Sequence, residues 1–139
     1  MNRSESADMR KPLQGIKVLD MSQGIAGPYG TMILALNGAD VIKVEPLEGD
    51  WCRVVGRSVG QESANFLAFN RGKRSLCLNA KSASGKEALL KLAADCDVFV
   101  ESFRPGAIRR LGFGYEALRK INPDIIYTSV SGFGQTGPS

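Results

Sequence analysis

The sequence contains no histidine among its 139 residues. Histidine is the usual general base beside a serine or cysteine nucleophile, and it is a common metal ligand. Its absence excludes Ser–His and Cys–His pairs within this chain and argues against a transition-metal site. We therefore expect no metal ligands here.

Long apolar runs are also absent. A transmembrane helix needs about 18 or more consecutive apolar residues, and no segment approaches that length. The opening residues, MNRSESADMRKP, lack the apolar core of a secretory signal, so we interpret residues 1–11 as a flexible, solvated arm. We expect no membrane partner.

Cysteine is scarce: Cys52, Cys77 and Cys96 are the only three, and no two have C-x-x-C spacing. Because their number is odd, and because Cys77 and Cys96 lie in apolar segments, we predict buried free thiols rather than a redox or metal site. Free thiols are typical of a reducing compartment, which predicts a cytoplasmic protein.

The overall composition is that of one globular domain, with 43% hydrophobic and 23% charged residues. The net charge of +4 favours an anionic ligand and is compatible with phosphates, nucleic acid or acidic lipid. Acidic residues alternate with the basic ones, and aromatic residues make up only 7% of the chain. Because stacking platforms are lacking, we expect no nucleic-acid partner.

Short apolar runs alternate with helical patterns along the chain, which predicts an α/β fold with a Rossmann-like parallel sheet flanked by helices. The expected strands are residues 16–19, 40–44, 75–78, 97–100 and 125–130. The expected helices are residues 28–36, 63–70, 84–94, a short helix ending at 111, and 115–120. Residues 46–61 are expected to form a long loop.

The turn after the first expected strand reads SQGIAG, which is G-x-G-x-x-G with Ser22 in the first glycine position. Glu45 follows Gly27 by 18 residues, where a dinucleotide enzyme keeps its ribose-binding acid. The missing glycine and Pro28, which removes an amide, both weaken an NAD interpretation. A packing turn with an exposed Glu45, or a site for another anion, remain as alternatives.

Basic residues follow two of the expected strands. Lys81 follows the third strand and Arg104 the fourth, so both could reach one ligand at the carboxyl edge of a parallel sheet. Arg71, Lys73 and Arg74 precede the third strand and should lie nearer the opposite edge, unless the turn folds over. The alternative for all of them is a solvated surface.

A series of short motifs resembles the opening of class III CoA-transferases, the CaiB/BaiF family that also contains formyl-CoA transferase and α-methylacyl-CoA racemase. The motifs run in order and with natural spacing from residue 12 to residue 138. They are PL at 12–13, GIKVLD at 15–20, AGP at 26–28, LNGADVIKVE at 36–45, GD at 49–50, NRGKRS at 70–75, DVFVESFRPG at 97–106, LGFGY at 111–115 and GFGQTGP at 132–138.

The resemblance implies that residues 12–139 are the truncated N-terminal part of a CoA-transferase large domain, which binds coenzyme A and forms an interlocked homodimer. The implied partners are acyl-CoA and a carboxylic acid acceptor. Family transferases use an aspartate nucleophile, and the racemase branch uses a His/Asp pair. Both sets follow the GQTGP segment, so we expect a fragment without catalytic residues, inactive alone. A fragment of a racemase-like enzyme, or a non-catalytic nucleotide-binding or assembly module, is the alternative.

The resemblance also implies which residues contact coenzyme A. The adenosine and phosphate region is matched by Leu78, Lys81, Ser102, Phe103, Arg104 and Arg110. The thioester end is matched by Ile25 and Ala26, where some family members have glutamine at the first of these positions. That departure points away from a strict formyl/oxalate enzyme. By the same match, Asp20, Asp50 and Asp97 are not the nucleophile.

Overall fold

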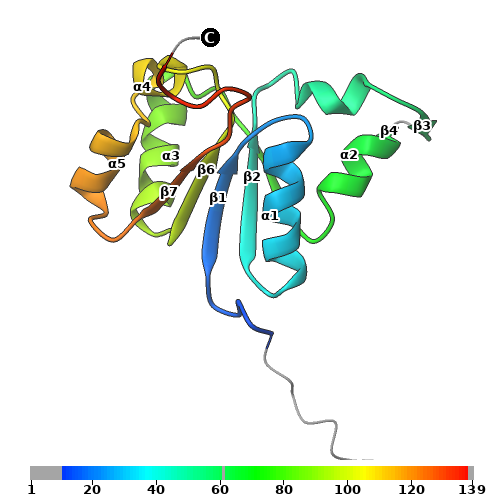
Figure 1. The fold of residues 1–139 in the computed structure, drawn as a ribbon, viewed down its shortest axis with the longest axis horizontal. Coiled ribbons are helices and arrows are strands. Elements are labelled where there is room, and N and C mark those ends of the chain that lie inside the picture. Colours follow the sequence, from blue (N-terminus) through cyan, green and yellow to red (C-terminus); the bar gives the residue numbers. More distant parts are fainter. Residues whose placement is uncertain (1–10, 61, 138–139) are drawn as a thin grey trace, which may run out of the picture.

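The structure, a computed structural model, describes residues 11–60 and 62–137. The arm expected at residues 1–11 lies outside this range except for its last residue, as does Pro138 at the end of the final motif. The described chain forms one five-stranded sheet in the order β5-β2-β1-β6-β7, with every neighbouring pair parallel. The predicted α/β class with a parallel sheet flanked by helices is confirmed (Figure 1).

The elements follow the predicted alternation, with boundaries shifted by one or two residues. The sheet strands are β1 (Lys17–Met21), β2 (Asp40–Glu45), β5 (Arg74–Cys77), β6 (Val98–Glu101) and β7 (Ile126–Ser129). The α-helices are α1 (Ala26–Leu36), α2 (Ala64–Phe69), α3 (Ala83–Ala94), α4 (Ala107–Leu111) and α5 (Tyr115–Ile121). The expected long loop contains a 3-10 helix, η1 (Trp51–Val54), and a small hairpin of β3 (Ser58–Val59) and β4 (Glu62–Ser63).

The order in which successive strands join the sheet reverses at β1, because β2 and β5 lie on one side of β1, and β6 and β7 on the other. Helices α1 and α2 lie on one side of the sheet, and α3 and α5 lie on the other (Figure 1). In an open parallel sheet, ligands bind outside the carboxyl ends of the strands at such a reversal. The order therefore places any ligand site near the ends of β1 and β6.

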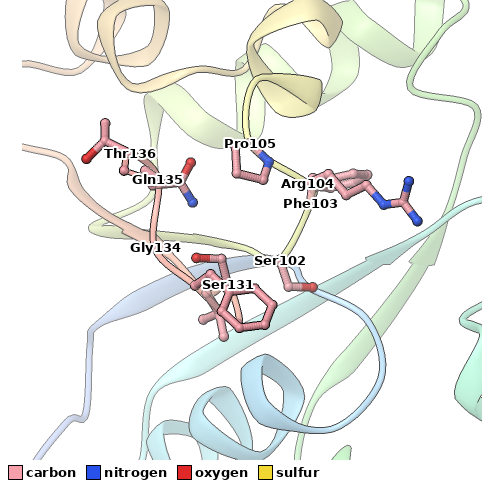
Figure 2. A pocket seen from close by; sticks show the side chains of 12 residues that line it. Ser102, Phe103, Arg104, Pro105, Ser131, Gly134, Gln135 and Thr136 are labelled. Atoms are coloured by element: carbon pink, nitrogen blue, oxygen red, sulfur yellow. The ribbon is translucent and has the colours of Figure 1, made fainter. Parts of the chain in front are cut away.

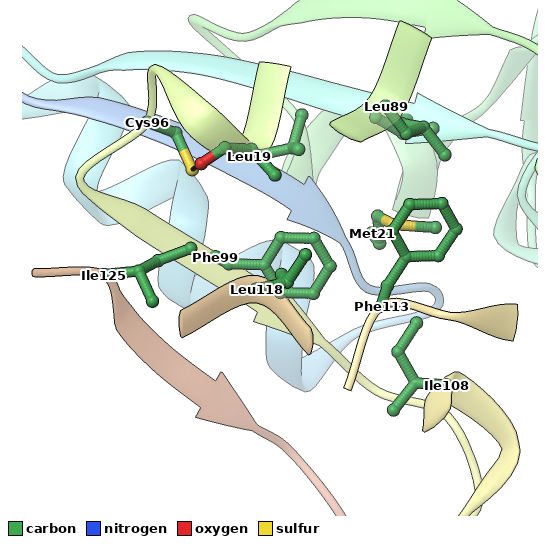
Figure 3. Packing of buried hydrophobic residues seen from close by; sticks show 11 residues of the cluster. Leu19, Met21, Leu89, Cys96, Phe99, Ile108, Phe113, Leu118 and Ile125 are labelled. Atoms are coloured by element: carbon green, nitrogen blue, oxygen red, sulfur yellow. Dashed lines mark hydrogen bonds between the residues drawn. The ribbon is translucent and has the colours of Figure 1, made fainter. Parts of the chain in front are cut away.

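The face covered by α3 and α5 holds the main apolar core (Figure 3). Leu89 of α3, Phe99 of β6, and Leu118 of α5 are each 0% exposed. Leu89 and Ala93 lie one helical turn apart and are both buried, as the amphipathic pattern of this helix predicts. Ala88, which the same pattern places on the buried face, is exposed. This core fixes the sheet and one of its two helical layers.

On β1 and β2, the opposite face is apolar only at its amino half, whereas on β6 Val100, beside Asp20, is also buried. In the amino half, Val18 of β1 and Val41 of β2 pack with Ala35 of α1. Two residues further along each strand, the side chains that face α1 are charged: Asp20 on β1 and Lys43 on β2, both buried. Side chains two apart in a strand share a face, so a buried polar cluster takes the place of an apolar core.

Three local predictions are corrected. Cys77 is exposed, because β5 is an edge strand, whereas Cys52 and Cys96 are buried as expected. Asp20, the residue after the first expected strand at 16–19, lies inside β1 and is fully buried. Glu45, which was expected to be exposed in one of the alternatives, is 2% exposed.

We expect Leu89→Ala to lower the free energy of unfolding by about 2–5 kcal/mol, because it removes buried contacts and leaves a cavity. Leu67→Ala is the matched control, since Leu67 lies on α2 and is 44% exposed. Urea unfolding followed by circular dichroism measures both. Equal losses for the two variants would contradict the placement of the core.

Candidate functional site

The turn after β1, residues 22–25, leads into α1 at the reversal point of the sheet, and its backbone polar groups are held by side chains. The Ser22 amide donates to Asp20 at 2.9 Å, and the Gln23 amide donates to Ser102 Oγ at 2.8 Å. The Gly24 amide donates to Asp50 at 3.1 Å. The acceptors come from three separate segments, so the turn is fixed by tertiary contacts.

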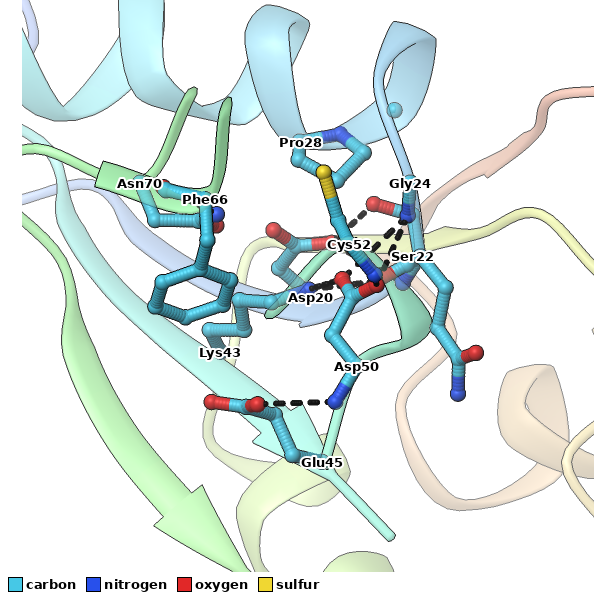
Figure 4. A network of polar contacts seen from close by, with 12 residues as sticks. Asp20, Ser22, Gly24, Pro28, Lys43, Glu45, Asp50, Cys52, Phe66 and Asn70 are labelled. Atoms are coloured by element: carbon cyan, nitrogen blue, oxygen red, sulfur yellow. Dashed lines mark hydrogen bonds and ion pairs between the residues drawn. The ribbon is translucent and has the colours of Figure 1, made fainter. Parts of the chain in front are cut away.

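Asp20 is the first of these acceptors (Figure 4). Its carboxylate also accepts from Thr31 Oγ1 of α1 at 2.5 Å and pairs with Lys73 Nζ at 2.9 Å. Lys73 further donates to the Pro28 carbonyl and to Asn70 Oδ1. Burial lowers the pKa of Lys73 from 10.5, and the charge of Asp20 opposes this shift. Lys73 therefore ties α1 to the sheet.

Lys43 and Asp50 form a second buried ion pair, with Nζ and Oδ2 2.8 Å apart and side chains 1% and 0% exposed. Lys43 also donates to the Ser22 carbonyl at 2.7 Å. Asp50 caps the 3-10 helix η1 through the Cys52 amide at 2.9 Å. Because breaking one partner of a buried ion pair costs about 3–5 kcal/mol, this pair is a strong constraint on the turn.

Glu45, at the end of β2, is the anchor for the loop that carries Asp50. Its carboxylate accepts from Arg53 Nε at 2.6 Å and Nη2 at 2.9 Å, and from the Asp50 amide and Ser75 Oγ. Burial by itself raises the pKa of Glu45, but the bonds from Arg53 and Asp50 outweigh burial and lower it from 4.5 to about 2. The Glu45 carboxylate is therefore ionised, and both of its oxygens accept hydrogen bonds from protein groups.

These contacts correct the dinucleotide interpretation of the SQGIAG turn. A pyrophosphate site needs free backbone amides at the glycine turn and a free acid on the second strand. The amides of Ser22, Gln23 and Gly24 are already bonded to side chains, and Glu45 is bonded to Arg53. These contacts favour the alternative of a packing turn for residues 22–24, although its acid is buried rather than exposed.

The structure also places the residues of the NRGKR segment. Lys73 was expected nearer the amino edge of the sheet unless its turn folds over, and its side chain is 2% exposed beside Asp20. Arg74 does lie at the amino edge, where it forms a two-point pair with Asp40 at 2.6 and 2.9 Å. Lys73 is thus a structural cation and not a ligand for a phosphate.

A cleft of about 270 Å³ opens at the carboxyl ends of β1, β2 and β5. One wall carries Leu78 and Lys81, and the opposite wall carries Phe103 and Leu111. The floor is formed by residues from the ends of β1 and β2 and the start of the following loop, namely Met21, Gln23, Val44, Glu45, Pro46, Leu47 and Glu48. The lining thus combines apolar side chains with the cation of Lys81 and the carboxylates of Glu45 and Glu48, as is typical of a small-molecule cleft with a few polar groups.

A second hollow, of about 470 Å³, lies between the segment after β6 and the segment after β7. Ser102, Phe103 and Arg104 line one side, and residues 130–137 line the other. Figure 2 shows the side chains of Phe103 and Arg104 extending away from Gln135 and Thr136. Phe103 belongs to both hollows, so the two lie on either side of this ring.

The structure brings five of the eight predicted contact residues to these adjoining hollows: Leu78, Lys81, Ser102, Phe103 and Arg104. Arg110 is exposed on α4 and lines neither hollow. Ile25 and Ala26 are exposed at the start of α1, on the turn that Ser102 holds through the Gln23 amide. Ser102 therefore has a structural bond in addition to any ligand contact.

Sequence reasoning missed Lys43, Asp50 and Lys73, which shape the turn without lining a hollow. The sequence of β2, DVIKVE, contained one signal for Lys43. A lysine two positions from a valine on the same face of a buried strand needs a buried partner for its charge.

No group of three or more potential metal ligands occurs within residues 11–60 and 62–137. In the same ranges, no helix is long and apolar enough to cross a membrane.

Comparisons with known proteins agree with this geometry. The model of CoA-transferase family III matches residues 13–139. The chain belongs to CoA-transferase family III. This membership confirms the resemblance carried by the ordered motifs.

Individual relatives cover nearly all of this chain. Human succinyl-CoA:glutarate CoA-transferase is 49% identical over 92% of the chain and 30% of its own length. Acetyl-CoA:oxalate CoA-transferase of Acetobacter aceti is 46% identical over 99% of the chain and 36% of its own length. A CaiB/BaiF family protein from Brucella suis is 42% identical with a TM-score of 0.88, over 93% of this chain and 35% of that structure. The chain spans about a third of the length of these relatives.

The Glu45–Arg53 pair predicts an acid-dependent loss of stability. Because the pKa of Glu45 in the folded protein is about 2 and its ordinary value is 4.5, the stabilisation is complete above about pH 4.5 and is lost as the pH falls towards 2. The expected loss is on the order of 3 kcal/mol. Urea unfolding at a series of pH values measures it.

Arg53→Met should flatten this pH dependence, because the pKa of Glu45 then rises towards its ordinary value. Arg74→Met is the matched control, since it removes an arginine from the exposed pair with Asp40, whose side chains are 63% and 50% exposed. The control should keep the wild-type slope. A wild-type slope in Arg53→Met would rule out this pair as the source.

Proposed function

We propose that this chain carries the coenzyme-A-binding part of an enzyme that transfers CoA from an acyl-CoA to a carboxylic acid. The observation that supports this proposal is the cleft at the carboxyl edge of the sheet in a member of CoA-transferase family III. The named relatives above are CoA-transferases for succinyl-CoA and glutarate and for acetyl-CoA and oxalate. Their names favour transferase over racemase chemistry for the whole protein.

Coenzyme A combines a flat adenine ring with several phosphates. The hollows offer apolar surface for the ring and the cations of Lys81 and Arg104, and Arg110 lies outside both hollows on α4. Leu78 and Phe103 supply apolar surface for the ring. Lys81, Arg104 and Arg110 are exposed, and none forms an ion pair with another residue of the described part of the chain. Guanidinium and ammonium groups that are not committed to carboxylates can bind phosphates.

The pantetheine arm would then run past Phe103 towards the start of α1, where Ile25 and Ala26 face solvent. The chain's role in the reaction is to hold CoA so that its thioester meets an aspartate supplied elsewhere in the full enzyme. That aspartate attacks the acyl-CoA carbonyl, forming a mixed anhydride and releasing CoA thiolate. The thiolate then attacks the aspartyl carbonyl of this anhydride, which displaces the donor carboxylate and gives an enzyme thioester. The acceptor carboxylate attacks the thioester, forming a second mixed anhydride and releasing the thiolate again. Attack of the thiolate on the acceptor carbonyl gives the new acyl-CoA and frees the aspartate.

The two buried aspartates beside the turn, Asp20 and Asp50, are not available as nucleophiles. Asp20 is 0% exposed and accepts from Ser22, Thr31 and Lys73. Asp50 is 1% exposed and pairs with Lys43. Neither carboxylate can reach a substrate without leaving its partners.

We extend the proposal to a homodimer in the reducing cytoplasm. Four apolar side chains on one side of α1 are between 42% and 49% exposed, namely Ile25, Tyr29, Ile33 and Leu36. A contiguous exposed apolar surface is typical of a protein interface. The three cysteines are free, and exposed Cys77 in particular favours a reducing compartment.

Calorimetry with CoA, NAD and ADP tests the proposed ligand. We expect CoA to bind and NAD not to bind, because the turn amides are occupied. Arg104→Ala/Arg110→Ala should weaken CoA binding on the order of 100-fold through the loss of two charge-assisted bonds.

The matched control is Lys91→Ala/Arg119→Ala, which removes two charges from the exposed parts of α3 and α5. It should leave CoA affinity unchanged at constant salt. Equal weakening by both variants would indicate only non-specific attraction.

The 139-residue chain should catalyse no acyl-CoA:carboxylate exchange. Turnover that is abolished by a mutation within the chain would contradict the proposal that the nucleophile is supplied elsewhere.

A further inference from the structure

The buried pair of Lys43 and Asp50 lies under the turn at residues 22–25 rather than in either hollow. Both side chains are at most 1% exposed. Replacing a buried ion pair with well-packed apolar residues is often neutral or stabilising, so such a pair is not explained by stability alone. The contacts of the pair with the backbone of the turn explain why the two charges are buried there.

Each member of the pair holds one backbone group of the turn. Lys43 Nζ donates to the Ser22 carbonyl at 2.7 Å, and the Asp50 carboxylate accepts from the Gly24 amide at 3.1 and 3.2 Å. The two charges also hold each other, at 2.8 Å. The turn is therefore clamped at two points, two residues apart, by charge-assisted bonds that are short and directional.

The ring of Trp51 packs against Gly24 of the turn. It follows Asp50 directly, and a Cβ added at Gly24 would meet its ring at 2.3 Å. Gly24 also has a φ of +80°, so a side chain there would be strained as well as crowded. With Asp50 below and Trp51 against the glycine, Ile25 and Ala26 are presented in one position at the start of α1.

We propose that Lys43 and Asp50 are positioning residues of the acyl-CoA site, which set where the Ser22–Ile25 turn presents Ile25 and Ala26 to the thioester end of the ligand. This inference rests on the proposed function. It assigns the pair a role through the turn and not through contact with CoA.

The double variant Lys43→Met/Asp50→Asn tests the proposal. It removes both charges together, so neither is left buried without a partner, and it keeps the side-chain volumes similar. We expect it to regain most of the stability lost by either single variant, and to bind CoA about tenfold more weakly than the wild-type chain. Calorimetry and urea unfolding measure these two effects.

Trp51 supplies an independent readout, because it is the sole tryptophan of the sequence and lies against the turn. Acrylamide quenching of its fluorescence should increase in the double variant as the turn leaves its ring. The matched control is Lys17→Met/Asp95→Asn, which removes an exposed pair with the same 2.8 Å separation. The control should keep wild-type quenching and CoA affinity.

The proposal is overturned if the folded double variant matches the wild-type chain in both quenching and CoA affinity, because the pair is then only structural. If the wild-type chain itself binds no CoA, the proposed function fails. The quenching comparison then decides by itself whether the charges fix the turn.

Discussion

The ion pair between Lys43 and Asp50 connects the sheet, the turn after β1, and the loop after β2. Lys43 belongs to β2, Asp50 begins η1, and both bind the backbone of the turn. Glu45 then fixes the same loop through Arg53 and the Asp50 amide. Because an unpaired buried charge is costly, a movement of any of these segments would either expose a charge to solvent or leave it buried without its partner. The carboxyl edge of the sheet is therefore rigid on its α1 side.

One face of the sheet mainly stabilises the fold, and the other positions the turn beside the proposed site. The face under α3 and α5 is packed with Leu89, Phe99 and Leu118, and burial of these side chains stabilises the fold. The carboxyl half of the other face is filled by hydrogen bonds and ion pairs that orient the turn (Figure 4). Directional contacts fix a backbone more narrowly than apolar packing does, which suits a surface that must present residues to a long ligand.

Sequence reasoning located the elements well, since apolar periodicity and turn residues act over a few neighbouring positions. It also placed Lys81 and Arg104 at one edge of the sheet, because residues following parallel strands meet there, and the family resemblance added Leu78 and Phe103. Lys81 lines one of the two adjoining hollows and Arg104 the other. It left the place of Lys73 open and did not predict that this side chain reaches Asp20, 53 residues earlier. It was wrong for Cys77, because an apolar run does not show that β5 is an edge strand.

The sequence by itself determined the α/β class, the order of the elements and, through its ordered motifs, membership of CoA-transferase family III. These features depend on local patterns along the chain. Only the tertiary structure decided which charges pair and which remain available to a ligand. Lys43, Lys73 and Arg53 form ion pairs with carboxylates of the chain. Lys81 and Arg104 line the hollows instead. The physical reason is that strand register and loop folding bring together charges far apart in the chain, and the cost of burying a charge alone then selects the partner.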